Sequence, residues 1–166
     1  MWIVPAAALA VVAALLLRGE PDRTHTVIAP PLEAKTLWVG YAEIDTIIAG
    51  AAEAFEAKDW KETSRLLSRA RFFIESGIRE GSFERVPPSL DLMLGLAEYN
   101  RGNYDKGISQ VTAAAEAEPG SGMYPYYLGW MHLGTGNGGE ARKSLERAAA
   151  LGGRYAGPSR EMLERL

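Results

Sequence analysis

The feature that most constrains the fold of this chain is a 34-residue repeat running from Pro88 to Tyr155. The segment Pro88–Ser121 aligns with the segment Gly122–Tyr155, and the sequence of each is typical of two short amphipathic helices joined by a turn. The aligned residues are Leu94-Gly95 with Leu128-Gly129, Val111 with Leu145, and Ala114 with Ala148. A period of this length built from helix pairs indicates a repeat array, in which each unit buries its apolar face against the next.

A weaker third copy lies upstream at the same period. Residues Ile44–Gly77 place Ala51 at the position of Gly95, and Trp60 at the position of Tyr104. Ten extra residues, 78–87, separate this copy from the next. Because three repeats are about the minimum for a stable array, the chain holds enough copies to fold as one.

In these features the chain resembles the tetratricopeptide repeat (TPR) family. The family has small residues where its paired helices cross, a tyrosine that often opens the second helix, and a proline that ends it. The matching residues are Gly95, Gly129, Ala114, Ala148, Tyr104 and Pro119. The last copy departs from the pattern, with Gly138 and Gly153 in place of the tyrosine and the proline, and we expect its glycine-rich turn to be looser. The expected fold class is all-α: a helix–turn–helix repeat array, or TPR-like solenoid, preceded by one apolar helix.

The preceding apolar helix is predicted at residues 1–18 as a membrane anchor, because Trp2–Leu17 is an uncharged apolar run. Sixteen helical residues span about 24 Å, less than the hydrocarbon core of about 30 Å, but Trp2 and Arg18 at its ends suit the two interfaces. A cleaved signal peptide, disfavoured by the absence of a basic region before the run, and a buried helix are the alternatives. The positive charges that follow the run predict a cytoplasmic domain, with a periplasmic or extracytoplasmic one as the alternative.

The remaining chain divides into a linker and a repeat domain. Residues 19–32 contain three prolines and are expected to form the linker. Residues 33–166 are expected to form the TPR-like domain. Its copies lie at about 44–77, 88–121 and 122–155, and a C-terminal capping helix at 157–166.

Composition excludes several kinds of chemistry. A net charge of −3 argues against nucleic acid as a partner, and the absence of cysteine excludes thiolate metal sites and thiol nucleophiles. The two histidines, His25 and His132, lie far apart, so we expect no metal, no cofactor and no catalysis. The turn 134–139 matches GxGxxG, but a helical pattern precedes it where a nucleotide site needs a strand, so no nucleotide is expected.

The TPR resemblance implies a protein or peptide partner bound in a concave groove. Four positions of each first helix line that groove in the family, and here they are mostly apolar or aromatic. The candidate partner-binding residues are Ile48, Phe55, Leu92, Leu96, Tyr99, Met123, Tyr126, Trp130 and Leu133. Ile48 and Ala52 stand where carboxylate-clamp TPR domains have polar residues, so a chaperone-tail ligand is not expected. The alternative occupant is a terminal segment of this same chain.

A basic stripe is predicted on the helix Trp60–Gly77, where Lys61, Arg65 and Arg69 recur every four residues. Together with Arg18 these side chains suit anionic lipid head groups, although a solvated surface is the simpler interpretation. The function expected from the whole sequence is a membrane-anchored TPR scaffold or adaptor without catalysis. The alternative is an integral structural or assembly subunit of a larger membrane protein complex.

Overall fold

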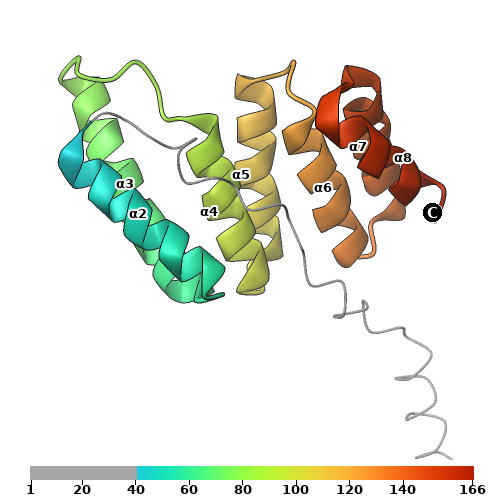
Figure 1. The fold of residues 1–166 in the computed structure, drawn as a ribbon, viewed down its shortest axis with the longest axis horizontal. Helices are drawn as coiled ribbons and strands as arrows, with labels where there is room; N and C mark the ends of the chain where they lie inside the picture. Colours follow the sequence, from blue (N-terminus) through green and yellow to red (C-terminus); the bar gives the residue numbers. More distant parts are fainter. Residues whose placement is uncertain (1–40) are drawn as a thin grey trace, which may run out of the picture.

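The computed structural model describes residues 41–166, which form a continuous array of helices (Figure 1). The elements are α2 (Ala42–Glu56), α3 (Trp60–Arg79), α4 (Pro88–Asn100), α5 (Tyr104–Ala117), α6 (Met123–Gly134), α7 (Gly138–Leu151), the 3₁₀ turn η2 (Gly153–Tyr155) and α8 (Ala156–Leu163). Each helix packs against its neighbour in sequence, most closely within the pairs α2–α3, α4–α5 and α6–α7. The predicted all-helical repeat array is therefore confirmed for this part of the chain.

The predicted membrane anchor and linker lie outside the described residues, as does Arg18. Among residues 41–166, none of the helices combines the length and apolar character needed to cross a bilayer. The anchor thus stays a prediction from the sequence.

The first helix of each pair (α2, α4 and α6) ends in the same backbone motif. The residue after each C-cap adopts a left-handed conformation: Lys58 with φ 58°, Gly102 with φ 88° and Gly136 with φ 77°. After α4, the N–H groups of Gly102 and Asn103 donate to the carbonyls of Tyr99 and Glu98, both at 2.9 Å. The same pair of bonds closes the other two turns. The glycine-rich turn after α6 was expected to be looser. It is instead as tight as the others, because the same two backbone bonds close it and the Thr135 hydroxyl also donates to the Met131 and His132 carbonyls.

Small residues allow the paired helices to cross closely. A Cβ atom added to Gly95 of α4 would lie 2.6 Å from Val111 Cγ2 and 2.8 Å from the Gly107 carbonyl oxygen of α5. A Cβ on Gly129 of α6 would lie 2.5 Å from Leu145 Cγ of α7. No side chain fits at these separations, which confirms the role predicted for these two glycines.

The ten inserted residues, 78–87, lengthen α3 by two residues and then form the connection to α4. Helix α3 has 20 residues, whereas α5 and α7 have 14 each. It continues to Arg79, and Gly81 with φ 79° then reverses the chain. Phe83 folds back over Gly77, with its ring centroid 4.6 Å from that of Tyr41. The insertion therefore extends α3 and closes the outer end of the first helix pair.

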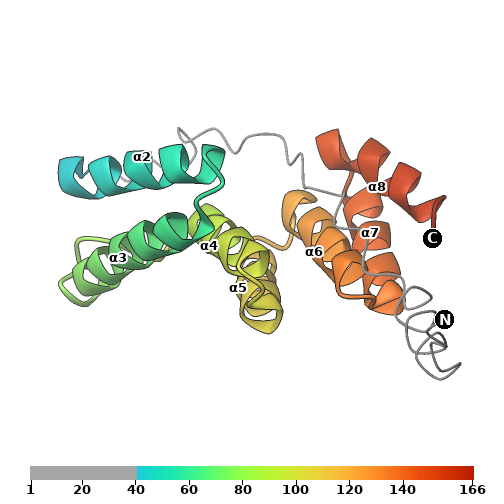
Figure 2. The same ribbon diagram turned by 90° about the horizontal axis from the view of Figure 1, so that it is seen from below.

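Helix α4 joins the two clusters that make up the core. One cluster contains Ile44, Ile48, Ala51, Leu67, Ala70, Ile74, Leu90, Met93 and Leu94. The other contains Leu92, Leu96, Tyr99, Val111, Ala114, Ala115, Tyr124, Tyr127, Leu128, Met131 and Tyr155. Because α4 contributes to both, every residue from 91 to 99 is buried. The array bends around this helix, so that α2 and α8 lie on the same side of the molecule in Figure 2.

Candidate partner-binding face

The candidate site is the side of the array formed by the first helices, which we call the inner face. It is defined by four register positions in each of α2, α4 and α6. These positions hold Asp45, Ile48, Ala52, Phe55, Ser89, Leu92, Leu96, Tyr99, Met123, Tyr126, Trp130 and Leu133. Nine of the twelve are the candidates predicted from the sequence, and the structure divides those nine into two groups by exposure.

The first group is partly exposed and gives the inner face its apolar surface. It consists of Phe55, Met123, Tyr126, Trp130 and Leu133, all half-buried. Met123, Tyr126, Trp130 and Phe55 pack against the core cluster around α6. Tyr126 is held further by aromatic contacts, with ring centroids 5.5 Å from Tyr127 and 5.3 Å from Tyr155. Side chains supported in this way are already ordered, so binding a partner costs less side-chain entropy.

The second group is buried. Ile48, Leu92 and Leu96 are each at most 3 % exposed, and Tyr99 is 7 % exposed. Ile48 belongs to the cluster of α2, α3 and α4, and the other three belong to the cluster that includes α6. In this conformation they support the inner face from beneath, and their contact with a partner stays a prediction.

The helices at the two ends of the inner face differ in charge. Helix α2 carries Glu43, Asp45, Glu53 and Glu56 and no lysine or arginine, and of these four only Asp45 lies at an inner-face position. The one ionisable side chain of α6 other than tyrosine is His132. Burial lowers the pKa of His132, and nearby Glu140 only partly opposes this shift. His132 is therefore neutral at pH 7, and the α6 end of the face is uncharged.

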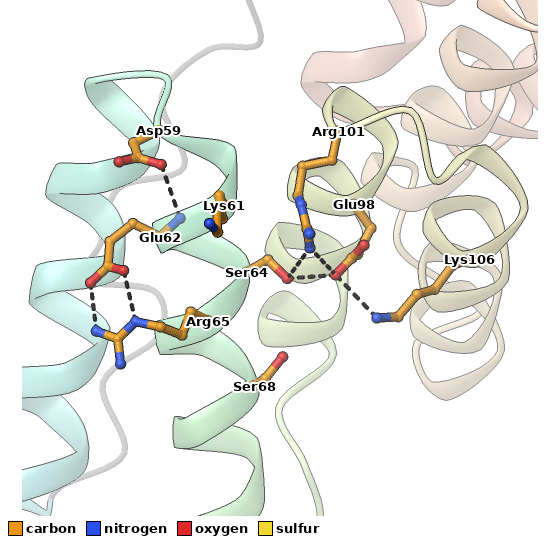
Figure 3. Close-up of a pocket in the computed structure, with 9 residues that line it drawn as sticks. All are labelled: Asp59, Lys61, Glu62, Ser64, Arg65, Ser68, Glu98, Arg101 and Lys106. Atoms are coloured by element: carbon orange, nitrogen blue, oxygen red, sulfur yellow. Dashed lines mark hydrogen bonds and ion pairs between the residues drawn. The ribbon is translucent and has the colours of Figure 1, made fainter.

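A second site, which sequence analysis missed, is a polar cavity of about 480 Å³ between α3, α4 and α5 (Figure 3). Its lining residues are Asp59, Lys61, Glu62, Ser64, Arg65, Ser68, Glu98, Arg101 and Lys106. Figure 3 shows Ser64, Arg101 and Lys106 converging on the carboxylate of Glu98 from three elements. The sequence signal for this network was Glu98, a carboxylate directly after the apolar residues 92–97 of α4.

Glu98 accepts bonds from four side chains although it is only 1 % exposed. Ser64 Oγ donates at 2.5 Å and Lys106 Nζ at 3.1 Å to Oε1, and Asn103 Nδ2 donates at 2.5 Å to Oε2. Arg101 Nη1 also donates to Oε1, at 3.1 Å. Burial by itself raises the pKa of Glu98, but the bonds from Ser64, Asn103 and Lys106 outweigh it and lower the pKa to about 2. The carboxylate is therefore ionised at neutral pH and fastens two repeats together.

The predicted basic stripe does not form a uniform surface. Arg65 makes a bidentate pair with Glu62, and Lys61 lines the polar cavity. The guanidinium carbon of Arg69 lies 5.7 Å from the centroid of the Phe73 ring. Binding of lipid by these three side chains stays a prediction. Among residues 41–166, no group of three or more histidine, aspartate or glutamate side chains is placed to hold a metal ion.

Comparison with known proteins identifies the fold. No protein-family model matches the chain, and a search of curated proteins also found no match. Among solved structures, PcrH from Pseudomonas aeruginosa matches with a TM-score of 0.64 at 16 % identity, over 77 % of this chain and 94 % of that chain. PcrH in complex with the chaperone binding region of PopB matches with a TM-score of 0.61 at 17 % identity, over 75 % of this chain and 98 % of that chain. At these identities the likeness shows the fold alone, which is that of an all-helical, TPR-like repeat array.

Proposed function

We propose that this chain is a TPR-like scaffold that binds a segment of another protein on its inner face and carries out no catalysis. The observation that carries the proposal is the row of half-buried apolar side chains along α6: Met123, Tyr126, Trp130 and Leu133. Aromatic residues supported from beneath by a packed core are the usual anchors of protein interfaces. The fold neighbour PcrH, seen in complex with a region of PopB, supports a role in binding a protein segment.

The chemistry of the face indicates which segments it would accept. Its α6 end is uncharged and apolar, whereas helix α2 at the other end carries four carboxylates and no basic side chain. An extended or helical segment with two or three apolar side chains suits α6, and a basic residue next to them suits α2. A strongly acidic segment would meet the carboxylates of α2 and is expected to be excluded.

The test is affinity capture with the full chain and two single variants. Trp130→Ala removes the largest anchor of the inner face, and we expect it to weaken partner binding by about 2 kcal/mol, or roughly thirtyfold. Leu151→Ala is the control, because Leu151 is 38 % exposed on α7 and does not belong to the inner face. Thermal melting of each variant separates a lost contact from a lost fold. If Trp130→Ala captures the same partners with the same affinity as the wild type, the proposed site is wrong.

A second candidate function is that of an assembly subunit, favoured by an exposed aromatic patch at the α2–α3 end. Tyr41, Phe72 and Phe73 are 47 %, 62 % and 37 % exposed. Tyr41 and Phe73 line a cavity of about 350 Å³ together with Phe83 and Ile44, and the ring centroid of Phe72 lies 6.0 Å from that of Phe73. Loss of a stable complex in Phe72→Ala, but not in Trp130→Ala, would favour this function over the scaffold.

Membrane anchoring is a further part of the proposal and is supported by the sequence run Trp2–Leu17 alone. The anchor would hold the scaffold beside a bilayer, with the repeat domain on the cytoplasmic side. Alkaline carbonate extraction of native membranes tests this arrangement. An anchored chain stays with the lipid pellet, whereas release of the full-length chain into the supernatant would contradict the anchor.

A further inference from the structure

The apolar surface of the inner face suggests which segment it binds first. Trp130 and Tyr126 offer aromatic surface on α6, and Phe55 offers it on α2, where its ring lies 5.2 Å from that of Trp60. Grooves lined by aromatic side chains are the usual binding sites of proline-rich segments, whose extended conformation is set before binding and costs little entropy.

The chain carries such a segment directly before the described residues. Residues 27–39 read VIAPPLEAKTLWV, with adjacent prolines at 30 and 31. Six apolar residues accompany the prolines and alanines: Val27, Ile28, Leu32, Leu37, Trp38 and Val39. The only charges are those of Glu33 and Lys35, so the segment is neutral overall and suits an uncharged face.

The segment is also long enough to reach α6. The described residues begin at Tyr41, next to the start of α2 at Ala42. Pro31 and Tyr41 are ten residue steps apart along the chain, which span at most about 33–36 Å when extended. Phe55 of α2 and Trp130 of α6 pack against the same core cluster, so with packed helices about 8–10 Å apart the two helices are separated by roughly 20 Å. Pro30 and Pro31 can therefore contact Trp130 without any change in the repeat array.

We propose that residues 27–39 of this chain occupy its own inner face, with the Pro30-Pro31 pair on the aromatic side chains of α6. This inference rests on the proposed function, since it assigns the first occupant of the same face. A tethered segment acts at an effective concentration on the order of millimolar. A segment of another protein must displace it, so the chain selects against weak ligands.

The first experiment measures whether the face is occupied in the full chain. The probe is a fluorescent peptide with the sequence of residues 27–39. The double variant Leu32→Asp, Trp38→Asp places two charges among the apolar residues of the segment, and is expected to release it. Thr24→Asp, Thr26→Asp adds the same two charges just before the segment and serves as the control. We expect the peptide to bind the released variant at least tenfold more tightly than it binds the wild type or the control.

Equal affinity for all three proteins, or no binding to the released variant, would overturn the inference. Adding Trp130→Ala to the released variant should remove the gain, because it takes away the aromatic surface that the prolines contact. If the peptide binds none of the proteins, but Trp130→Ala in the full chain captures fewer partners than the wild type, the inference fails and the proposed function stands. If Trp130→Ala changes neither the peptide affinity nor the partner capture, both fail.

The second experiment uses the absence of cysteine in the chain. The pair Ala29→Cys, Leu133→Cys places one thiol in the segment and one on the inner face. The control pair, Ala29→Cys, Ala150→Cys, places the second thiol at an exposed position on α7. With a short bismaleimide at about 1 µM protein, we expect the inner-face pair to form an intramolecular cross-link much faster. Equal rates would overturn the inference, as would a dimer whose yield rises with concentration, which would make a second copy the occupant.

Discussion

The hydroxyl of Tyr99 donates a hydrogen bond of 3.0 Å to the backbone carbonyl oxygen of Met131, from α4 to α6. The two residues are 32 positions apart, so this bond ties one repeat to the next. Tyr99 is buried, and its hydroxyl lies beside Gly134, where a Cβ atom would collide with it. The spacing between the two helices is thus set partly by the length of one tyrosine side chain.

Replacing Tyr99 with phenylalanine is expected to cost about 1 kcal/mol of unfolding free energy at pH 7, because the Met131 carbonyl loses its side-chain donor. Burial, and to a lesser extent Tyr104, raises the pKa of Tyr99 to about 12. Because the pKa is higher in the folded state, the stability contributed by the protonated Tyr99 hydroxyl is complete below pH 10 and is lost as the pH rises toward 12. Urea unfolding of Tyr99→Phe and wild type at pH 7 and at pH 11 measures both effects. Tyr41→Phe, at an exposed position before α2, is the control.

Glu98→Gln is expected to destabilise the array by about 1–3 kcal/mol at neutral pH, since it removes the charge to which Lys106 and Arg101 donate. The pKa of Glu98 is depressed to about 2. Its stabilising effect is therefore present above the ordinary glutamate pKa of about 4.3 and is lost as the pH falls toward 2. Chemical unfolding between pH 7 and pH 2.5 should show the wild-type advantage over Glu98→Gln shrinking. A constant difference would contradict the assignment, and Glu116→Gln, on the surface of α5, supplies the control.

Lys58→Gly is expected to stabilise the chain by about 1 kcal/mol, because a residue with a Cβ is strained at φ 58° and glycine is not. Gly102→Ala makes the opposite change at the equivalent turn, where φ is 88°, and should destabilise by a similar amount. Differential scanning calorimetry of the two variants compares the shifts in Tm. Shifts of the same sign would show that the turns are not equivalent.

Gly95→Ala is expected to destabilise the array by about 1–3 kcal/mol, because the new Cβ meets Val111 and the Gly107 carbonyl at less than contact distance. Gly50→Ala is the matched change within α2, where the nearest atom to the new Cβ is Leu66 Cδ1 at 3.5 Å. There the higher helix propensity of alanine should raise stability by up to about 1 kcal/mol. Equilibrium unfolding by guanidinium checks both, and a neutral Gly95→Ala would show that the α4–α5 crossing relaxes.

Much of the fold followed from the repeat, because small residues at a fixed period identify where helices must cross. Gly95 and Gly129 were assigned to crossings from the repeat spacing together with the resemblance to the TPR family, and the structure places both against the paired helix. The tight turn at Gly136 was not expected from its glycines. Propensity describes the isolated chain, and backbone hydrogen bonds between residues already held by packing decided this turn.

The inner face was harder to predict, because the helical register shows which residues share one side of a helix but not how deeply each side chain is buried. Trp130 and Tyr126 remain half-buried, but Leu92, Leu96 and Tyr99 at the same register are buried. The polar network around Glu98 also escaped prediction, since Ser64 and Lys106 are brought to it from two other helices.

The sequence by itself determined the period, the helix pairs and the residues at their crossings, since these depend on contacts between neighbours along the chain. Only the tertiary structure decided which inner-face side chains lie at the surface and which carboxylate is held ionised. Burial and electrostatics depend on every group packed around a residue, and for α4 those groups come from helices on both sides of it.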